Sequence, residues 1–192
     1  MNATHYDRPD QPTGAFIVVR VLKRTALFIA IIMAWVLLAA ALAQAAAPDP
    51  AVVPFRGYPP GTIVVKTHER HLYFVLDPYR AMRFPVGVGR AGMQWTGLAH
   101  VDGKYVWPAW AAPPMIRREN PRLPKVIPGG APNNPMGARA MTLRGGEYAI
   151  HGTDRPSSVG RFISHGCIRM YNRDIVRLFP MVRVGTPVFV ER

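Results

Sequence analysis

The chain has a single cysteine, Cys167, among its 192 residues, so no disulfide can form within it. It also lacks a run of basic residues and the paired cysteine and histidine spacings of zinc modules, although its net charge is +13. Beyond residues 26–43 it has no apolar stretch long enough to cross a bilayer, and it has no internal repeat. These absences exclude a disulfide-stabilised fold, a multi-span membrane protein and a repeat protein, and they argue against nucleic-acid binding.

The first 45 residues have the layout of an export signal. A basic flank precedes the apolar run over residues 26–43, and a small-x-small cleavage pattern follows it. The same run could remain as an uncleaved inner-membrane anchor, because a helix of this length spans about 27 Å. Either way, the positive flank predicts that the rest of the chain lies outside the cytoplasm. We therefore divide the chain into a signal or anchor (1–45), a linker rich in Ala and Pro (46–60) and one folded domain (61–192).

The folded domain is rich in strand patterns and poor in helix patterns. Asp102-Gly103 is a turn signal between two weak strands, and a helix pattern begins at Asn172, a candidate N-cap, and ends at Pro180. The sequence thus predicts a mainly β fold with one short helix after the cysteine. The expected strands are 62–67, 71–76, 81–89, 98–101, 104–106, 141–144, 148–150 and 186–191. The first two should form a hairpin, and 141–144 and 148–150 should form a second one around Gly145-Gly146.

Residues 108–136 form a Pro-rich segment that holds eight prolines and no strand pattern. A loop of this length inside a compact domain is unusual unless it has a function. It could be a rigid wrap on the surface, without a role in binding. We favour a segment that covers or guides a substrate.

The residues around Cys167 are polar and include Gly166, which favours a reactive thiol over the small buried hydrophobe that a lone cysteine usually is. Two histidines could accept the thiol proton. His165 would share a face with Cys167 in an extended segment, and His151 could lie opposite it on an antiparallel strand. Gly152 and Gly166 allow close backbone approach, so their amides could stabilise an oxyanion.

A zinc site is the alternative use of this thiol. Two histidines and a thiolate could hold Zn²⁺, but no carboxylate is regularly spaced with them. We therefore expect no metal and no cofactor.

Two segments together resemble the signature of L,D-transpeptidase catalytic domains of the YkuD type: His151-Gly152-Thr153 and the heptapeptide from Ser164 to Met170. The resemblance covers roughly residues 55–191 and points to the proteobacterial branch. One stretch departs from it, because the Thr-Pro-Thr-Gly common in that family reads Gln94-Trp95-Thr96-Gly97 here. The resemblance extends to segments 84–89, 116–119, 134–137 and 184–188.

The resemblance implies a β-sandwich-like catalytic domain and a periplasmic enzyme that acts on peptidoglycan stem tetrapeptides. Cys167 would attack the carbonyl of the third residue, expel D-alanine and form a thioester, with His151 as general base and acid. The Gly152 carbonyl would orient the imidazole, and amides near Gly166 and Cys167 would form the oxyanion hole. The remaining implied roles are pocket shaping by Ser164 and His165 and binding of a substrate carboxylate by Arg169.

The acceptor stays open. An amine of another stem peptide would give a 3–3 cross-link, an amine of an outer-membrane protein would give protein attachment, and a free D-amino acid is a third choice. With water as acceptor, the same site would be an L,D-carboxypeptidase or endopeptidase. A catalytically silent wall-binding module is the alternative from another class. For the enzyme, the resemblance also predicts acylation by carbapenems.

Overall fold

The computed structural model describes residue 33 and residues 50–145 and 148–192, and the fold is that of the second unit of the chain, Pro50–Arg192. The predicted signal or anchor lies, apart from residue 33, outside the described residues. Within the described part, no helix combines the length and the apolar composition that crossing a membrane requires.

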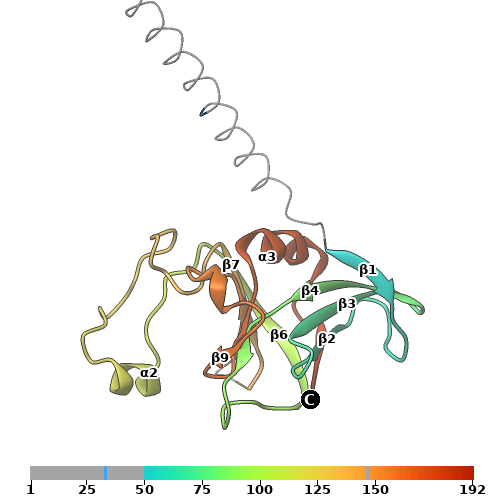
Figure 1. The fold of residues 1–192 in the computed structure, drawn as a ribbon, viewed down its shortest axis with the longest axis horizontal. Coiled ribbons are helices and arrows are strands. Elements are labelled where there is room, and N and C mark those ends of the chain that lie inside the picture. Colours follow the sequence, from blue (N-terminus) through green and yellow to red (C-terminus); the bar gives the residue numbers. More distant parts are fainter. Residues whose placement is uncertain (1–32, 34–49, 146–147) are drawn as a thin grey trace, which may run out of the picture. The chain divides into compact units, whose positions relative to one another are not determined.

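Within residues 50–145 and 148–192, nine strands form one sheet in the order β1-β4-β3-β2-β11-β6-β7-β8-β10 (Figure 1). Short strands β5 (Val88–Gly89) and β9 (Phe162–Ser164) pair in parallel beside it. The strands of the large sheet are β1 (Ala51–Pro54), β2 (Ile63–Lys66), β3 (His71–Asp77), β4 (Arg80–Pro85), β6 (Gly97–Val106), β7 (Arg139–Leu143), β8 (Ala149–His151), β10 (Ile168–Arg169) and β11 (Pro187–Glu191).

Strand β6 joins the two halves of this sheet, which are β1-β4-β3-β2-β11 on one side of it and β7-β8-β10 on the other. Its first part pairs with β11 and its second part with β7, and the register shifts between Val101 and Gly103. The expected turn at Asp102-Gly103 is therefore wrong, because the chain continues through a bulge. The Asp102 carboxylate accepts a hydrogen bond from Thr142 on β7, which holds the bulge in the ladder. A bulge bends and twists a strand, so one strand can serve both halves.

The larger of two hydrophobic clusters takes side chains from both halves of the sheet. It takes Ile63 and Leu72 from β2 and β3, and Met141 and Ile150 from β7 and β8, all fully buried. The mainly β, sandwich-like fold predicted from the sequence is thus confirmed, as is the hairpin of β7 and β8.

Residues 51–54, placed in the linker by sequence, form β1 instead and pair antiparallel with β4. The stretch carries two valines and leads into Phe55, whose ring stacks on Tyr73 at 4.5 Å between centroids. Covering the edge of β4 and this aromatic ring satisfies backbone groups and buries apolar surface together. The folded domain therefore begins earlier than residue 61.

The helix after the cysteine is α3 (Asn172–Leu178), followed by the 3₁₀ turn η2 (Phe179–Met181). Ile175 and Leu178 are buried in the core, whereas Val176 is 42% exposed. The N-cap is Tyr171, and the Asn172 side chain makes no cap because it bonds to other loops. The expectation of an Asn172 cap was wrong.

A second helix, α2 (Pro114–Glu119), interrupts the Pro-rich segment, and the sequence did not predict it. Pro114 occupies its first turn, where a missing backbone N–H costs nothing because that group has no partner within the helix. The segment extends to one side of the sheet in Figure 1, where it is drawn in yellow. A further 3₁₀ turn, η1 (Pro156–Ser158), lies between β8 and β9.

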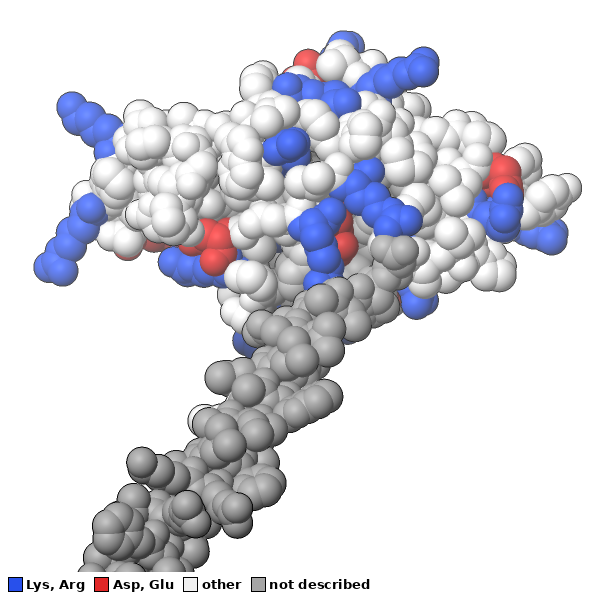
Figure 2. All heavy atoms as spheres, turned by 90° about the horizontal axis from the view of Figure 1, so that it is seen from above, with Lys and Arg blue, Asp and Glu red and all other residues white. Residues whose placement is uncertain are grey.

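The surface is basic, as the composition predicts. Lys and Arg side chains are spread across the face in Figure 2, with few Asp and Glu between them. A spread of this kind attracts anions without defining one binding site.

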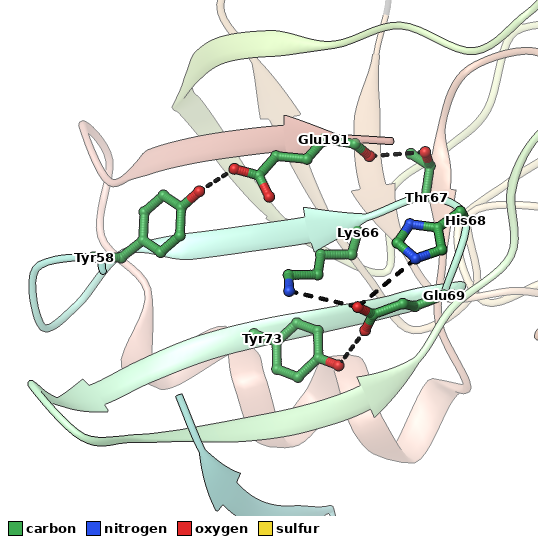
Figure 3. Close-up of polar contacts among 7 residues, drawn as sticks. All are labelled: Tyr58, Lys66, Thr67, His68, Glu69, Tyr73 and Glu191. Atoms are coloured by element: carbon green, nitrogen blue, oxygen red, sulfur yellow. Dashed lines mark hydrogen bonds and ion pairs between the residues drawn. The ribbon is translucent and has the colours of Figure 1, made fainter. Parts of the chain in front are cut away.

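Polar contacts surround the smaller hydrophobic cluster, which includes Val64 and Tyr73 (Figure 3). The Tyr58 hydroxyl donates to the Glu191 carboxylate, and the Thr67 hydroxyl donates to the Glu191 carbonyl at 2.7 Å. Glu69 accepts from Tyr73 and pairs with Lys66 at 3.4 Å. These contacts link β2, β3 and β11, which are neighbours in the sheet.

Candidate active site

Strands β8 and β10 lie side by side, and their ends bring His151 and Arg169 together. The two strands are parallel, with Arg169 directly opposite His151 and Ile168 opposite Ile150. The antiparallel neighbour expected from the sequence is therefore wrong. The chain crosses over through η1 and β9 and returns in the same direction, so Arg169, and not Cys167, is opposite the histidine.

The histidine is held from within its own segment. His151 is only 4% exposed, and its Nδ1 lies 2.6 Å from the carbonyl oxygen of Gly152. A carbonyl can only accept a hydrogen bond, so the proton of the neutral ring lies on Nδ1 and Nε2 is left to act as a base. This is the contact that the resemblance implied for Gly152.

Burial keeps both reactive groups uncharged. It lowers the pKa of His151 to about 4, helped by the positive charge of Arg169 and opposed by hydrogen bonds to the carbonyls of Gly152 and Pro135. Burial also raises the pKa of the Cys167 thiol, against a backbone hydrogen bond from Ala149 and the charge of Arg169. At neutral pH the site therefore contains a thiol and a neutral imidazole, and the thiolate has to form during attack.

Ser164 shapes the cysteine loop from inside. Its hydroxyl oxygen accepts the Gly166 N–H at 3.1 Å, and the hydroxyl donates to the Cys167 carbonyl at 2.5 Å. Ser164 is 1% exposed, so these bonds replace water for buried backbone groups. The amides of Gly152 and Gly166, expected from the sequence to face an oxyanion, both have partners within the fold. The Gly152 N–H donates to the Arg139 carbonyl at 3.0 Å, and the Gly166 N–H donates to Ser164.

Asn172 braces the histidine side of the site. Its Oδ1 accepts the N–H groups of Ala138 at 2.9 Å and Thr153 at 3.2 Å, and its Nδ2 donates to the Thr153 carbonyl at 3.0 Å. The Thr153 N–H and the Gly152 carbonyl belong to one planar peptide. Asn172 therefore fixes the peptide that holds the imidazole.

A pocket of about 290 Å³ lies between the Pro-rich segment and the cysteine loop. The Pro-rich segment, including α2, forms one wall, and neither Cys167 nor His151 is among the lining residues. The opposite wall has charged groups of both signs, Asp154, Arg155 and Arg169, together with His165 and Ile163. Other lining residues are Trp110, Ile116, Glu119, Asn120, Leu123, Ile127, Asn133 and Pro135.

Arg169 has the geometry of an anion-binding residue. Its backbone is pinned between His151 on β8 and Gly87, with which it exchanges two hydrogen bonds of 2.8 Å. Its Nε is buried and, within residues 50–145 and 148–192, has no hydrogen-bond partner. A buried donor without a partner costs free energy, which a carboxylate at this position would recover.

Glu119, at the end of α2, ties the Pro-rich wall to the cysteine loop. One carboxylate oxygen lies 2.6 Å from Arg90 Nη2, and the other lies 2.9 Å from His165 Nε2. These partners, Arg90 first, hold the pKa of Glu119 below its usual value. His165, a candidate base in the sequence, is thus engaged in holding the pocket wall.

No cluster of three or more His, Cys, Asp or Glu residues that could bind a metal ion occurs in the described part of the chain.

Comparisons with known proteins agree with this geometry. The sequence model of the YkuD family, the L,D-transpeptidase catalytic domain, matches residues 60–190. The chain belongs to the YkuD family. The resemblance inferred from the signature segments is thereby confirmed.

Two curated relatives are similar to this YkuD domain. "Putative L,D-transpeptidase YqjB" of Bacillus subtilis (strain 168) is 48% identical over 133 residues, which are 67% of this chain and 69% of that protein. "Probable L,D-transpeptidase ErfK/SrfK" of Escherichia coli (strain K12) is 40% identical over 135 residues, 66% of this chain. The match spans only 42% of the length of the Escherichia coli protein.

The fold is also found among solved structures. The L,D-transpeptidase from Mycobacterium smegmatis superposes with a TM-score of 0.55 at 18% identity, covering 76% of this chain and 69% of that one. At that identity the likeness concerns the fold alone.

Two residues that touch the cysteine loop of this YkuD domain were missed in the sequence. Trp95 donates from its indole Nε1 to the Gly166 carbonyl at 3.0 Å, and its ring stacks on Tyr148. The departure from the family pattern at 94–97 was the available signal for Trp95. Nothing in the local sequence marks Tyr148, because its contact depends on the fold.

Proposed function

We propose that the protein is a periplasmic L,D-transpeptidase that acts on peptidoglycan stem tetrapeptides through an acyl-enzyme on Cys167. The observation that carries the proposal is the junction of β8 and β10. There a buried His151, oriented by its Nδ1 contact with the Gly152 carbonyl, sits in register with Arg169, two residues after Cys167. Membership of the L,D-transpeptidase family supplies the reaction class.

In the first step, His151 takes the thiol proton while the Cys167 sulfur attacks the carbonyl of the third stem residue. This proton transfer has to accompany attack, since burial favours the neutral thiol and the neutral imidazole. The imidazolium then gives the proton to the amine of the departing D-alanine, and a thioester remains. Arg169 binds a substrate carboxylate through the guanidinium that faces the pocket.

In the second step, an acceptor amine attacks the thioester carbonyl and loses a proton to His151. The carbon–sulfur bond breaks, and the proton returns to the sulfur, which regenerates the thiol. A stem peptide as acceptor gives a 3–3 cross-link, and an outer-membrane protein or a free D-amino acid uses the same chemistry. The Pro-rich wall, tied down through Glu119, bounds the space in which donor and acceptor meet.

The place of action follows from the same proposal. Peptidoglycan lies outside the cytoplasm, and the basic flank with the apolar run over residues 26–43 is a route for export. If that run is not cleaved, the enzyme works at the inner membrane.

The test is incubation of the purified protein with disaccharide-tetrapeptide, with mass analysis of the products. A dimer that has lost one D-alanine supports the transpeptidase, and tripeptide alone means that water is the acceptor. Cys167→Ala should give neither product. If the wild-type protein gives no product and no covalent adduct with imipenem, the enzyme proposal fails and a wall-binding module is the better interpretation.

A further inference from the structure

The residue that departs most clearly from the family pattern, Trp95, contacts the nucleophile loop directly. Its indole N–H donates to the Gly166 carbonyl at 3.0 Å across 71 positions of sequence. The bond joins two segments that are far apart in the sequence, and it lies next to Cys167.

Three successive peptide units of the loop are each held at one group by one of two side chains. Ser164 binds the Gly166 N–H on one side and the Cys167 carbonyl on the other. The peptide between them, made of the Gly166 carbonyl and the Cys167 N–H, is not touched by Ser164. Trp95 binds the carbonyl of that middle peptide.

A trans peptide is planar, and its C=O and N–H point in opposite directions. Fixing the Gly166 carbonyl therefore also fixes the direction of the Cys167 N–H. Glycine allows such a peptide to rotate easily, and Gly166 already has a φ of +115°, which other residues rarely adopt. The bond from Trp95 to the Gly166 carbonyl therefore restrains a peptide that glycine alone would leave easy to rotate.

The indole is itself rigidly supported. Its ring stacks on Tyr148 at 4.9 Å between centroids and 6° between planes, and both rings pack against the main core. Tyr148 also lies against Gly166, where an added Cβ would come within 2.3 Å of its ring. The tyrosine thus closes one side of the glycine, and the tryptophan holds its carbonyl.

We propose that Trp95 is a positioning residue for acyl transfer: by holding the Gly166 carbonyl, it aims the Cys167 N–H at the oxyanion that forms when the thiol attacks. This inference rests on the proposed function, since it needs an acyl-enzyme. An oxyanion donor works only if it is oriented before charge develops, so loosening the peptide should slow acylation. The thiol and His151 should keep their intrinsic reactivity.

Two reactions of Cys167 distinguish a loss of oxyanion stabilisation from a loss of thiol reactivity. Acylation by imipenem passes through a tetrahedral oxyanion, whereas alkylation by iodoacetamide is a displacement at a saturated carbon and forms none. Trp95→Phe keeps a ring to stack on Tyr148 and removes the N–H donor. We expect acylation of the full-length variant to slow about tenfold, the value of one hydrogen bond of roughly 1.4 kcal/mol, with alkylation unchanged within about twofold.

Trp107→Phe is the matched control, because Trp107 is 52% exposed and does not line the pocket. It should change neither rate. Replacing Trp95 with β-(3-benzothienyl)alanine, which has the same shape with sulfur in place of N–H, repeats the test if Trp95→Phe folds poorly. It should reproduce the selective loss of acylation.

The outcomes are distinct. If the wild-type protein is acylated and Trp95→Phe is acylated equally fast, the inference is overturned and the proposed function stands. If acylation and alkylation fall together, Trp95 only maintains the loop, and the inference is again overturned. If the wild-type protein is alkylated but never acylated, the proposed function itself fails.

Discussion

The two walls of the pocket are built in different ways. One wall includes Arg169, which backbone pairing between β10 and β8 sets beside His151, a buried residue that does not itself line the pocket. Ser164, Asn172 and Gly152 bond the loops that follow these strands. On the other wall, α2 of the Pro-rich segment contacts the cysteine loop through the Glu119 side chain, which pairs with His165.

We infer that the two walls have different roles, one in the chemical step and the other in substrate binding. Reacting groups need a fixed geometry, which a sheet supplies, whereas a wall that admits a substrate has to move. Variants on the sheet wall should therefore change the rate of chemistry, and variants on the Pro-rich wall should change binding.

The largest effect is expected from the histidine. His151→Ala should lower the rate of acylation by imipenem by about 10²–10⁴-fold, because the buried thiol loses the base that accepts its proton. Stopped-flow measurement of acylation, with circular dichroism as a check of folding, provides the test. Retention of more than a tenth of the wild-type rate would mean that another group, such as His165, is the base.

Asn172 tests whether the peptide that holds the imidazole matters. Asn172→Ala removes the acceptor of two backbone N–H groups, so we expect acylation to slow about tenfold and stability to fall by about 1–2 kcal/mol. Asn172→Asp keeps the acceptor and adds a negative charge near His151, which raises the pKa of that residue. The acid limb of its acylation profile should therefore move to higher pH. If the acid limb of the acylation profile of Asn172→Asp does not shift, Asn172 does not influence the pKa of His151.

The pH dependence of acylation tests whether His151 and Cys167 are both neutral in the resting enzyme. Because burial lowers the pKa of His151 to about 4, the base stays neutral, and acylation should be constant from about pH 8 down to about pH 5. In the unfolded chain His151 becomes protonated as pH falls below about 6.5, whereas in the folded protein it stays neutral down to about pH 4. Stability should therefore decline as pH falls from 6.5 toward 4, by roughly 3 kcal/mol in total for this group.

Urea unfolding across this pH range, compared with His151→Gln, isolates that contribution. The glutamine variant should lose less stability on acidification. An acid limb of acylation near pH 6.5 would show instead that the histidine is solvated in the working enzyme.

The smallest effect is expected on the Pro-rich wall. Glu119→Gln weakens the contacts with Arg90 and His165, so KM for the tetrapeptide should rise about two- to fivefold while kcat stays the same. Asp77→Asn is a matched control, because it breaks an exposed carboxylate pair with Arg80 outside the site. A fall in kcat with unchanged KM for Glu119→Gln would contradict the division between the two walls.

Local patterns predicted the parts of the fold that depend on local sequence. Alternating apolar residues identified the strands of both hairpins, and the pattern before Pro180 identified α3. The bulge at Asp102-Gly103 was missed, because a turn and a bulge use the same residues and only pairing with β7 decides between them. The parallel pairing of β8 and β10 depends on the crossover between them, which no local pattern encodes.

The same limit applies to the site. Cys167, His151, Gly152 and Arg169 could be found because they stand in two short signature segments. Asn172 was predicted as a helix N-cap, but it bonds the loops at Ala138 and Thr153 instead. Both roles use the same side-chain amide, so the sequence alone does not distinguish them. Trp95 comes from a distant part of the sequence, and only its bond to the Gly166 carbonyl shows what it does.

The central claim is that Cys167 carries the acyl group. The most direct measurement is mass spectrometry of the protein after brief incubation with disaccharide-tetrapeptide and quenching in acid. We predict a tripeptide adduct, linked by a thioester on the peptide that contains Cys167, and its loss in Cys167→Ala. An adduct on another residue, or continued release of D-alanine by Cys167→Ala, would contradict the account.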